Sequence, residues 1–249
     1  MHYPIKIALG QNATIFPKIN RIAYNVFMNK IDWIFFDVGG VLIEDDVFEE
    51  TRRSLLLRTL RVLDSSITES NLDEMMLKAS SMTGPINDNV LNLFIRDKQK
   101  LYIARNFLAG RKNELNEAAA ENCVRKEAKI VLGKLAKKYQ LGLIANQPTA
   151  NKILLEEAGV SKFLNHFLVS QEHGFGKPDL RYFQSVFNAT KANPQRSVMV
   201  DNNIERGLHP AKRLKMTTVW FNAHKKEVPD DNNVDFTVNN LQGLLDLFC

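Results

Sequence analysis

The amino-acid sequence predicts an α/β protein, a doubly wound parallel sheet with a small α-helical cap domain. Two observations favour this fold class. Several short apolar runs lack strict alternation, which is typical of strands that are buried on both faces. Helical patterns separate the later runs, and strands that alternate with helices indicate βαβ units in a parallel sheet.

Six runs are predicted to be strands, and most of them are rich in Val, Ile and Phe. They are Trp33–Asp37, Leu141–Asn146, His166–Ser170, Ser197–Asp201, Thr217–Phe221 and Asp235–Val238. Four helical patterns fall among or after the last five of these strands. They are Ala150–Ala158, Leu180–Thr190, Ile204–Leu214 and Leu241–Leu247.

The interval between the first two predicted strands does not show this alternation of strands and helices. From about Val47 to Lys138 no segment has a convincing strand pattern, and Ser66-Ile67-Thr68-Glu69 fits a capping box at a helix start. Further along, apolar residues recur at helical spacing, at Val90, Phe94, Leu101, Ala104 and Leu108. The interval is therefore expected to fold as several helices.

These patterns predict three parts. Residues 30–46 and 126–249 form the core domain, residues 47–125 form a helical cap over the carboxyl ends of the strands, and residues 1–29 form an N-terminal extension. The acidic run Glu44-Asp45-Asp46 is expected at the start of the first cap helix, where negative charge is favourable.

Charge and composition exclude several classes of protein. The net charge is +5, but residues 1–30 hold four basic side chains and no acidic one, so the rest of the chain is close to neutral. A nucleic-acid-binding face is therefore not indicated, and no apolar stretch is long enough for a membrane span. Two cysteines, Cys123 and Cys249, do not make a disulfide framework, which favours a reducing cytoplasm.

Polar residues gather where the predicted strands end. Asp37 ends the first strand, Asn146 the second, and Asp201 with Asn202 the fourth, while Lys177 follows the third. Ligands of open parallel sheets bind outside the carboxyl ends of the strands. We therefore expect these side chains to converge on one crevice.

Four segments in this order resemble the motifs of the haloacid dehalogenase superfamily. They are Phe36–Leu42, Leu143–Asn146, Gly176–Asp179 and Val198–Lys212. The resemblance extends from about Ile31 to the C-terminus. Each motif is weak alone, but four in order at strand ends, with a helical insertion after the first, are a strong signal.

The resemblance implies a Rossmann-like core and a hydrolase that uses Mg²⁺. Asp37 would be the nucleophile and Lys177 the second catalytic residue, and the substrate's phosphoryl group would be bound by Gly40, Asn146 and Lys177. The metal would be held by Asp37, Gly39, Asp201 and Asn202. The implied substrate is a small phosphomonoester.

The sequence departs from the family's motifs at four positions. Gly39 replaces a second aspartate that serves as general acid and base, a loss that commonly costs about 10²–10⁴ in rate. Ala145 replaces a hydroxyl residue, and Asn202 and Gly207 stand where the fourth motif has aspartates.

Three functions therefore remain open at this point. The first is a Mg²⁺-dependent phosphatase with low or altered activity. The second is a metal-free hydrolase of the 2-haloacid dehalogenase type, and the third is a catalytically inactive protein that keeps the fold for binding. Four cap arginines could reach a substrate anion: Arg52, Arg53, Arg58 and Arg61. The oligomeric state is not predicted.

Overall fold

The computed structural model describes residues 7–8, 13–15, 30–227 and 231–249. The chain divides into two compact units. One consists of Met1–Ile43 and Val124–Cys249, and the other of Glu44–Cys123. Within the described ranges, none of the helices combines the length and the apolar character that crossing a lipid bilayer requires. Each unit is described by itself.

The first unit is built on a sheet with five parallel strands, so the predicted α/β fold is confirmed. The strands are β3 (Trp33–Phe36), β6 (Gln140–Leu143), β7 (Ser197–Asp201), β8 (Thr217–Phe221) and β9 (Phe236–Val238). They are arranged in the order β9-β8-β7-β3-β6. Because β6 lies on one side of β3 and β7 on the other, the chain changes direction at β3. That is the switch point at which open sheets bind ligands.

Two short strands extend this sheet beyond β9. β2 (Ala13–Ile15) pairs antiparallel with β9, and β1 (Ile7–Ala8) pairs antiparallel with β2. Both fall in the segment for which the sequence predicts an N-terminal extension. The rest of that segment lies outside the described residues.

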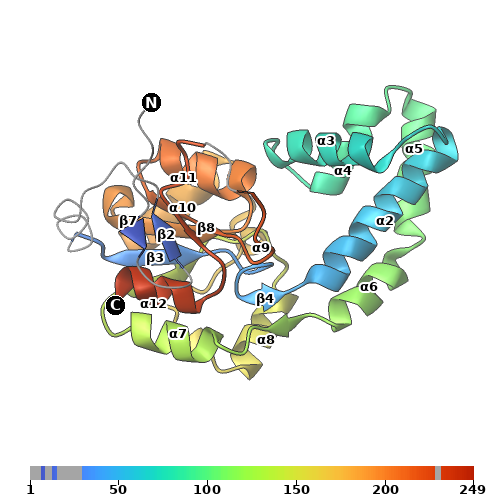
Figure 1. Ribbon diagram of the computed structural model, residues 1–249. Helices are drawn as coiled ribbons and strands as arrows, with labels where there is room; N and C mark the ends of the chain where they lie inside the picture. Colours follow the sequence, from blue (N-terminus) through green and yellow to red (C-terminus); the bar gives the residue numbers. More distant parts are fainter. Residues whose placement is uncertain (1–6, 9–12, 16–29, 228–230) are drawn as a thin grey trace. The chain divides into compact units, whose positions relative to one another are not determined.

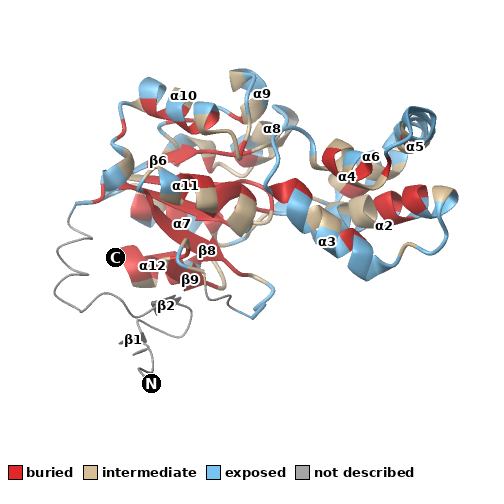
Figure 2. Cartoon of the chain, turned by 90° about the horizontal axis from the view of Figure 1, so that it is seen from above, coloured by how far each residue is buried: buried red, intermediate tan, exposed pale blue. Residues whose placement is uncertain are grey.

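Helices cover both faces of the sheet (Figure 1). On one face lie α7 (Ala128–Leu135) and α12 (Gln242–Phe248), and on the other α10 (Leu180–Thr190) and α11 (His209–Arg213). Adjacent residues of β3 point to opposite faces. Ile34 and Phe36 join the α7 and α12 core, whereas Phe35 joins the α10 and α11 core. Burial on both faces leaves the strands almost fully covered, as Figure 2 shows.

This unit also contains two smaller α-helices, besides the short 3-10 helices Ser161–Phe163 and Pro194–Arg196. The two α-helices are α8 (Ala150–Glu157) and α9 (Ser170–His173). The helix predicted over Ile204–Leu214 begins as a π-helical turn, Ile204–Leu208, and continues as α11. π-Helical turns are often found at functional sites.

The second unit is helical apart from its two end residues, Glu44 and Cys123, which belong to short strands. Its helices are α2 (Asp46–Leu63), α3 (Glu69–Ser80), α4 (Ile86–Phe94), α5 (Lys98–Ala109) and α6 (Lys112–Ala120). They share a core of their own, in which Leu56, Leu60, Leu72 and Val90 are buried. Asp45 is the N-cap residue of α2, and Asp46 lies in its first turn.

The structure corrects three local predictions. The capping box lies two residues later than predicted, because Thr68 caps α3 and pairs with Asn71 rather than Ser66 with Glu69. The N-cap residue must be extended while the following residues are helical, and it is Thr68 that has the extended conformation.

The other two corrections concern strands. The strand predicted over His166–Ser170 is reduced to a single parallel bridge between His166 and Gly142, since the chain turns into α9 at Ser170. The interval predicted to contain no strand holds a short one, β5 (Cys123–Val124), which pairs with β4 (Ile43–Glu44). At two residues, β5 is too short to show a periodic pattern.

Candidate active site

Asp37 lies at the switch point, directly after β3. Its backbone N–H donates to the carbonyl of Val200 at 2.9 Å, which continues the β3–β7 pairing to the end of the strand. The side chain is 9% exposed. Its Oδ1 accepts the N–H of Val38 at 2.8 Å, and among the described residues no hydrogen bond reaches Oδ2. One carboxylate oxygen is therefore held and the other is available.

A tight turn follows Asp37 and is built around Gly40. The N–H groups of Leu42 and Ile43 both donate to the carbonyl of Val38. Gly40 has a φ of +69°, in the left-handed region that favours glycine. A Cβ at this position would lie 2.0 Å from Nδ2 of Asn202, so the turn and the Asn202 side chain are packed together.

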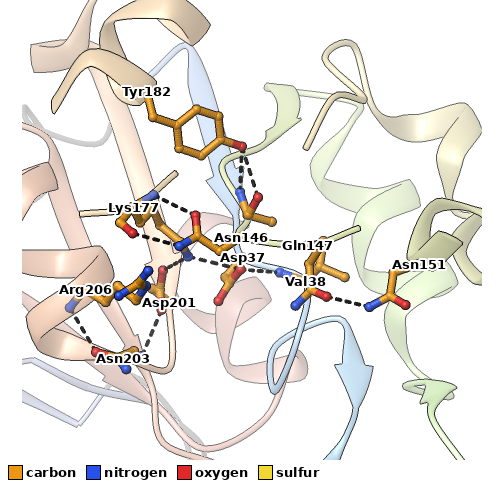
Figure 3. Close-up of polar contacts among 11 residues, drawn as sticks. Asp37, Val38, Asn146, Gln147, Asn151, Lys177, Tyr182, Asp201, Asn203 and Arg206 are labelled. Carbon is orange, nitrogen blue, oxygen red and sulfur yellow. Dashed lines mark hydrogen bonds and ion pairs between the residues drawn. The ribbon is translucent and has the colours of Figure 1, made fainter. Parts of the chain in front are cut away.

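Lys177 joins the ends of β3 and β7 through two carboxylates (Figure 3). Its Nζ lies 3.0 Å from Oδ1 of Asp37 and 2.5 Å from Oδ2 of Asp201. Lys177 is 2% exposed and Asp201 is fully buried. The sequence predicts that these three residues converge, and the structure brings them together.

The electrostatics of this cluster follow from burial. Burial alone lowers the pKa of Lys177, but the carboxylates of Asp201 and Asp37 outweigh it, so its pKa lies above the ordinary value. Burial raises the pKa of Asp201 to about 7, and Asp37 contributes in the same direction, although Lys177 opposes both. When both carboxyl groups are ionised, the single ammonium of Lys177 leaves an excess of one negative charge, which favours a further cation.

The side chain of Asn146 holds the main chain of Lys177 through two hydrogen bonds. Its Oδ1 accepts the N–H of Lys177 at 2.6 Å, and its Nδ2 donates to the carbonyl of the same residue at 2.7 Å. Gly176 is needed beside it, because a Cβ there would lie 2.7 Å from Oδ1 of Asn146. The amide thus fixes the main chain of the lysine, a role that the sequence does not reveal.

Two more residues at the site escaped prediction. Tyr182, which is fully buried, uses its hydroxyl to accept the N–H of Ala145 and to donate to its carbonyl, both at 3.1 Å. Arg125 donates to the carbonyls of Gly40 at 3.2 Å and Val41 at 2.9 Å. Both act through backbone groups, which leave no signal in a motif.

The remaining predicted residues lie around the cluster. Gly39 is buried in the turn. The carbonyl of Asn202 accepts the indole N–H of Trp220 at 3.1 Å, which fixes its backbone. Oδ1 of Asp201 accepts the N–H of Asn203 at 2.8 Å, so both oxygens of Asp201 have partners within the protein.

The four cap arginines all have partners within their own unit. Arg52 bonds to Glu49 and Asn87, and Arg53 to Glu69 and Asp73. Arg58 bonds to Glu114, and Arg61 to the carbonyl of Ile67. These bonds connect α2 to other segments of the second unit.

The donor atoms near Asp37 suit a hard cation. Mg²⁺ prefers oxygen ligands, and the carboxylate of Asp37, the carbonyl of Gly39 and the amide oxygen of Asn202 are of that kind. The negative excess of the cluster favours the same ion. Within the ranges that the structure describes, however, no three His, Cys, Asp or Glu side chains group together as metal ligands. The oxygen donors beside Asp37 fit a Mg²⁺ ion.

A parallel sheet with a carboxylate at its switch point, beside a buried lysine, is an arrangement suited to nucleophilic catalysis. Residues 31–214 match the haloacid dehalogenase-like hydrolase family, and the chain belongs to that family. The resemblance found in the sequence is therefore confirmed.

Named relatives cover most of the chain. The pyrimidine 5′-nucleotidase YjjG of Escherichia coli is 28% identical over 88% of this chain and 99% of its own length. The glyceraldehyde 3-phosphate phosphatase of Methanothermobacter thermautotrophicus is 23% identical over 82% of this chain and 93% of its own. The structure of a 2-haloacid dehalogenase from Pseudomonas syringae superposes with a TM-score of 0.53 at 16% identity, covering 87% and 97% of the two chains. That likeness shows the fold alone.

Proposed function

We propose that this protein is a Mg²⁺-dependent phosphatase that hydrolyses a small phosphomonoester through a phosphorylated Asp37. One observation carries the proposal. The carboxylate of Asp37 keeps one oxygen free at the switch point, while Lys177, buried and 3.0 Å away, supplies positive charge beside it. A carboxylate with a fixed orientation and a neighbouring cation is suited to attack an anionic ester.

The reaction follows from these groups. Oδ2 of Asp37 attacks the phosphorus, the bond to the ester oxygen breaks, and its electron pair leaves with that oxygen. Lys177 offsets the negative charge that accumulates, and a bound Mg²⁺ supplies further electrostatic stabilisation of the phosphoryl oxygens. Gly39 offers no acid, so water protonates the leaving group. A second water then hydrolyses the acyl phosphate, which releases phosphate and restores the carboxylate.

The substrate class rests on the relatives. Both curated relatives carry names of enzymes that act on small phosphorylated molecules, and the near-neutral body of the chain gives no reason to invoke a nucleic acid. The two cysteines, Cys123 and Cys249, are both free and exposed. That supports a reducing compartment, the cytoplasm.

The test is hydrolysis of p-nitrophenyl phosphate with and without Mg²⁺. We expect turnover that requires Mg²⁺ and disappears in Asp37→Asn. The matched control is Asp32→Asn, which alters an exposed aspartate just before the same strand, paired with Arg196, and should leave turnover unchanged. Turnover that survives in Asp37→Asn would overturn the proposal, and so would chloride release from 2-chloropropionate in EDTA without any phosphatase activity.

A second candidate, an inactive binding protein, is favoured by two observations. Both oxygens of Asp201 are engaged within the protein, and Gly39 carries no acid. Calorimetric titration with Mg²⁺ and inorganic phosphate separates the two functions. Binding of either ligand, with no turnover across a broad panel of phosphate esters, would favour the second candidate.

A further inference from the structure

Gly207 lies beside the carboxylate of Asp201 and has no space for a side chain. A Cβ at position 207 would lie 2.0 Å from Oδ2 and 2.2 Å from Cγ of Asp201. The conflict is with a side chain and not with the backbone. Gly207 is also not among the glycines with positive φ. Space, and not backbone conformation, therefore requires glycine here.

The side chain that fills this space is fixed on both sides. Oδ2 of Asp201 lies 2.5 Å from Nζ of Lys177, and Oδ1 accepts the N–H of Asn203 at 2.8 Å. Asp201 is fully buried, so its carboxylate cannot swing into solvent to make room. Any side chain at 207 would have to displace the partner of the lysine.

A carboxylate placed at 207 could reach the same point. By standard bond lengths an aspartate oxygen lies about 2.4 Å from its own Cβ, and the Cβ position at 207 is 2.0 Å from Oδ2 of Asp201. An oxygen from residue 207 can thus lie within about half an ångström of the present Oδ2. An aspartate at position 201 or an aspartate at position 207 could therefore place a carboxylate oxygen at this point, but not both at once.

From this we infer that positions 201 and 207 form an exclusive pair, in which Asp201 supplies the carboxylate that holds Lys177 and Gly207 supplies the space for it. Asp201 is then a positioning residue for the lysine. The inference also gives a physical reason for the glycine at a position where the resemblance implies an aspartate. It deepens the proposed function, but its first test does not depend on turnover.

The test is a double-mutant cycle in thermal or denaturant unfolding, with Asp201→Gly, Gly207→Asp and the combined variant. Asp201→Gly leaves a buried lysine with one partner fewer, and Gly207→Asp forces two carboxylates into one space. Each single change should raise the unfolding equilibrium constant by about 10²-fold or more. The combined variant should recover most of that loss.

Two further variants separate space from charge. Asp201→Asn keeps the shape of the side chain at position 201 and removes its charge. Gly207→Ala keeps the charge of Asp201 but fills the space beside it with a methyl group. Both variants should be less stable than the wild type. The control is Gly110→Ala, at an exposed helix end where a Cβ meets nothing closer than 3.4 Å. That variant should be neutral or slightly more stable, as expected for alanine in place of helical glycine.

Turnover gives a second measurement. If the wild type hydrolyses p-nitrophenyl phosphate, kcat should fall in Asp201→Gly and return to within about tenfold in the combined variant. If the wild type has no turnover, the proposed function fails but the unfolding cycle still decides this inference. Additive losses in the cycle, or a Gly207→Ala variant as stable as Gly110→Ala, would overturn it. The comparison of the alanine variants decides even if the combined variant does not fold.

Discussion

Gly39 sets the chemical limit of this site. The family's first motif has an aspartate where this chain has Gly39, two residues after Asp37, and that aspartate protonates the leaving group. Without it, the rate depends on how readily the leaving group departs unprotonated. Aryl phosphates release a stable phenolate, whereas alkyl phosphates release a strongly basic alkoxide.

We therefore expect a strong preference for aryl over alkyl phosphates and a gain when the acid is restored. Gly39→Asp should raise turnover of an alkyl phosphate by about 10²-fold, at the lower end of what a general acid contributes. Turnover of p-nitrophenyl phosphate should change much less, because its leaving group needs no proton.

The matched control is Gly39→Asn, which has a similar shape but no acidic proton and should give no gain. Steady-state kinetics with both substrates measures the effect. Equal rates for the two substrates in the wild type would contradict this account of Gly39.

Residue identities explain how much of the site could be predicted. Asp37 and Asp201 end predicted strands and Lys177 follows one, and the rule that strand ends converge is enough to group them. The two hydrogen bonds of Asn146 to the main chain of Lys177 depend on loop conformation. No sequence pattern encodes that conformation.

At the scale of elements, the turn after β3 is held by a residue distant in sequence. Arg125 donates to the carbonyls of Gly40 and Val41, and its own N–H donates to the carbonyl of Leu42. Its guanidinium also lies over the ring of Phe221, 5.1 Å from the centroid. The arginine therefore fixes the turn that carries the candidate metal and phosphoryl ligands.

Removing this guanidinium should cost both stability and activity. Arg125→Met keeps much of the apolar stem and deletes two charge-assisted hydrogen bonds, for which we expect a loss of about 2–4 kcal/mol in the free energy of unfolding. In kinetics, kcat/KM should fall because the turn is no longer fixed.

The control is Arg196→Met, which breaks an exposed ion pair with Asp32 and should cost less than about 1 kcal/mol. Denaturant unfolding of the two variants makes the comparison. Equal losses would show that Arg125 is an ordinary surface arginine.

The sequence predicts elements unevenly for a physical reason. Strands such as β7 and β8 are buried at every position, and both are found at their predicted residues. The segment at His166 forms a single bridge at the edge of the sheet beside β6. Its apolar run resembles a strand, but the turn into α9 ends the pairing.

At the scale of the whole molecule, buried histidines tie stability to pH. His166 is 7% exposed, its Nε2 has no hydrogen-bond partner among the residues that the structure describes, and its ring lies 5.7 Å from that of His173. Burial, with a smaller contribution from His173, lowers the pKa of His166 to about 4 from an ordinary 6.5. Burial lowers the pKa of His173 as well.

The sign of the pH effect follows from this shift. Between pH 6.5 and about 4 the unfolded chain binds a proton at His166 that the folded protein does not, so stability falls as the pH falls through this range. The loss from His166 should reach about 3 kcal/mol near pH 4. Above pH 6.5 the contribution is complete and the stability should be flat with respect to this group.

Denaturant unfolding between pH 7 and 4 measures this dependence. His166→Phe removes the titrating group and should flatten the curve, and the cost at pH 7 should be small because Nε2 has no partner to lose. A variant with the same pH dependence as the wild type would assign the effect to other groups.

The whole fold was the most predictable feature, because the order of strands and helices constrains a doubly wound sheet closely. The antiparallel addition of β1 and β2 beyond β9 was not predictable. Two strands of two and three residues are too short for a periodic signal.

The nucleophilic role of Asp37 is the central claim, and the covalent intermediate tests it most directly. The protein is mixed with p-nitrophenyl phosphate and Mg²⁺, quenched in acid, and its intact mass is measured. Since Gly39 supplies no base for the second step, the intermediate should accumulate, and the wild type should gain the mass of one phosphoryl group, located at Asp37 by peptide mapping. Asp37→Asn should gain none. Turnover without any phosphorylated protein, or a phosphoryl group on another residue, would contradict the account.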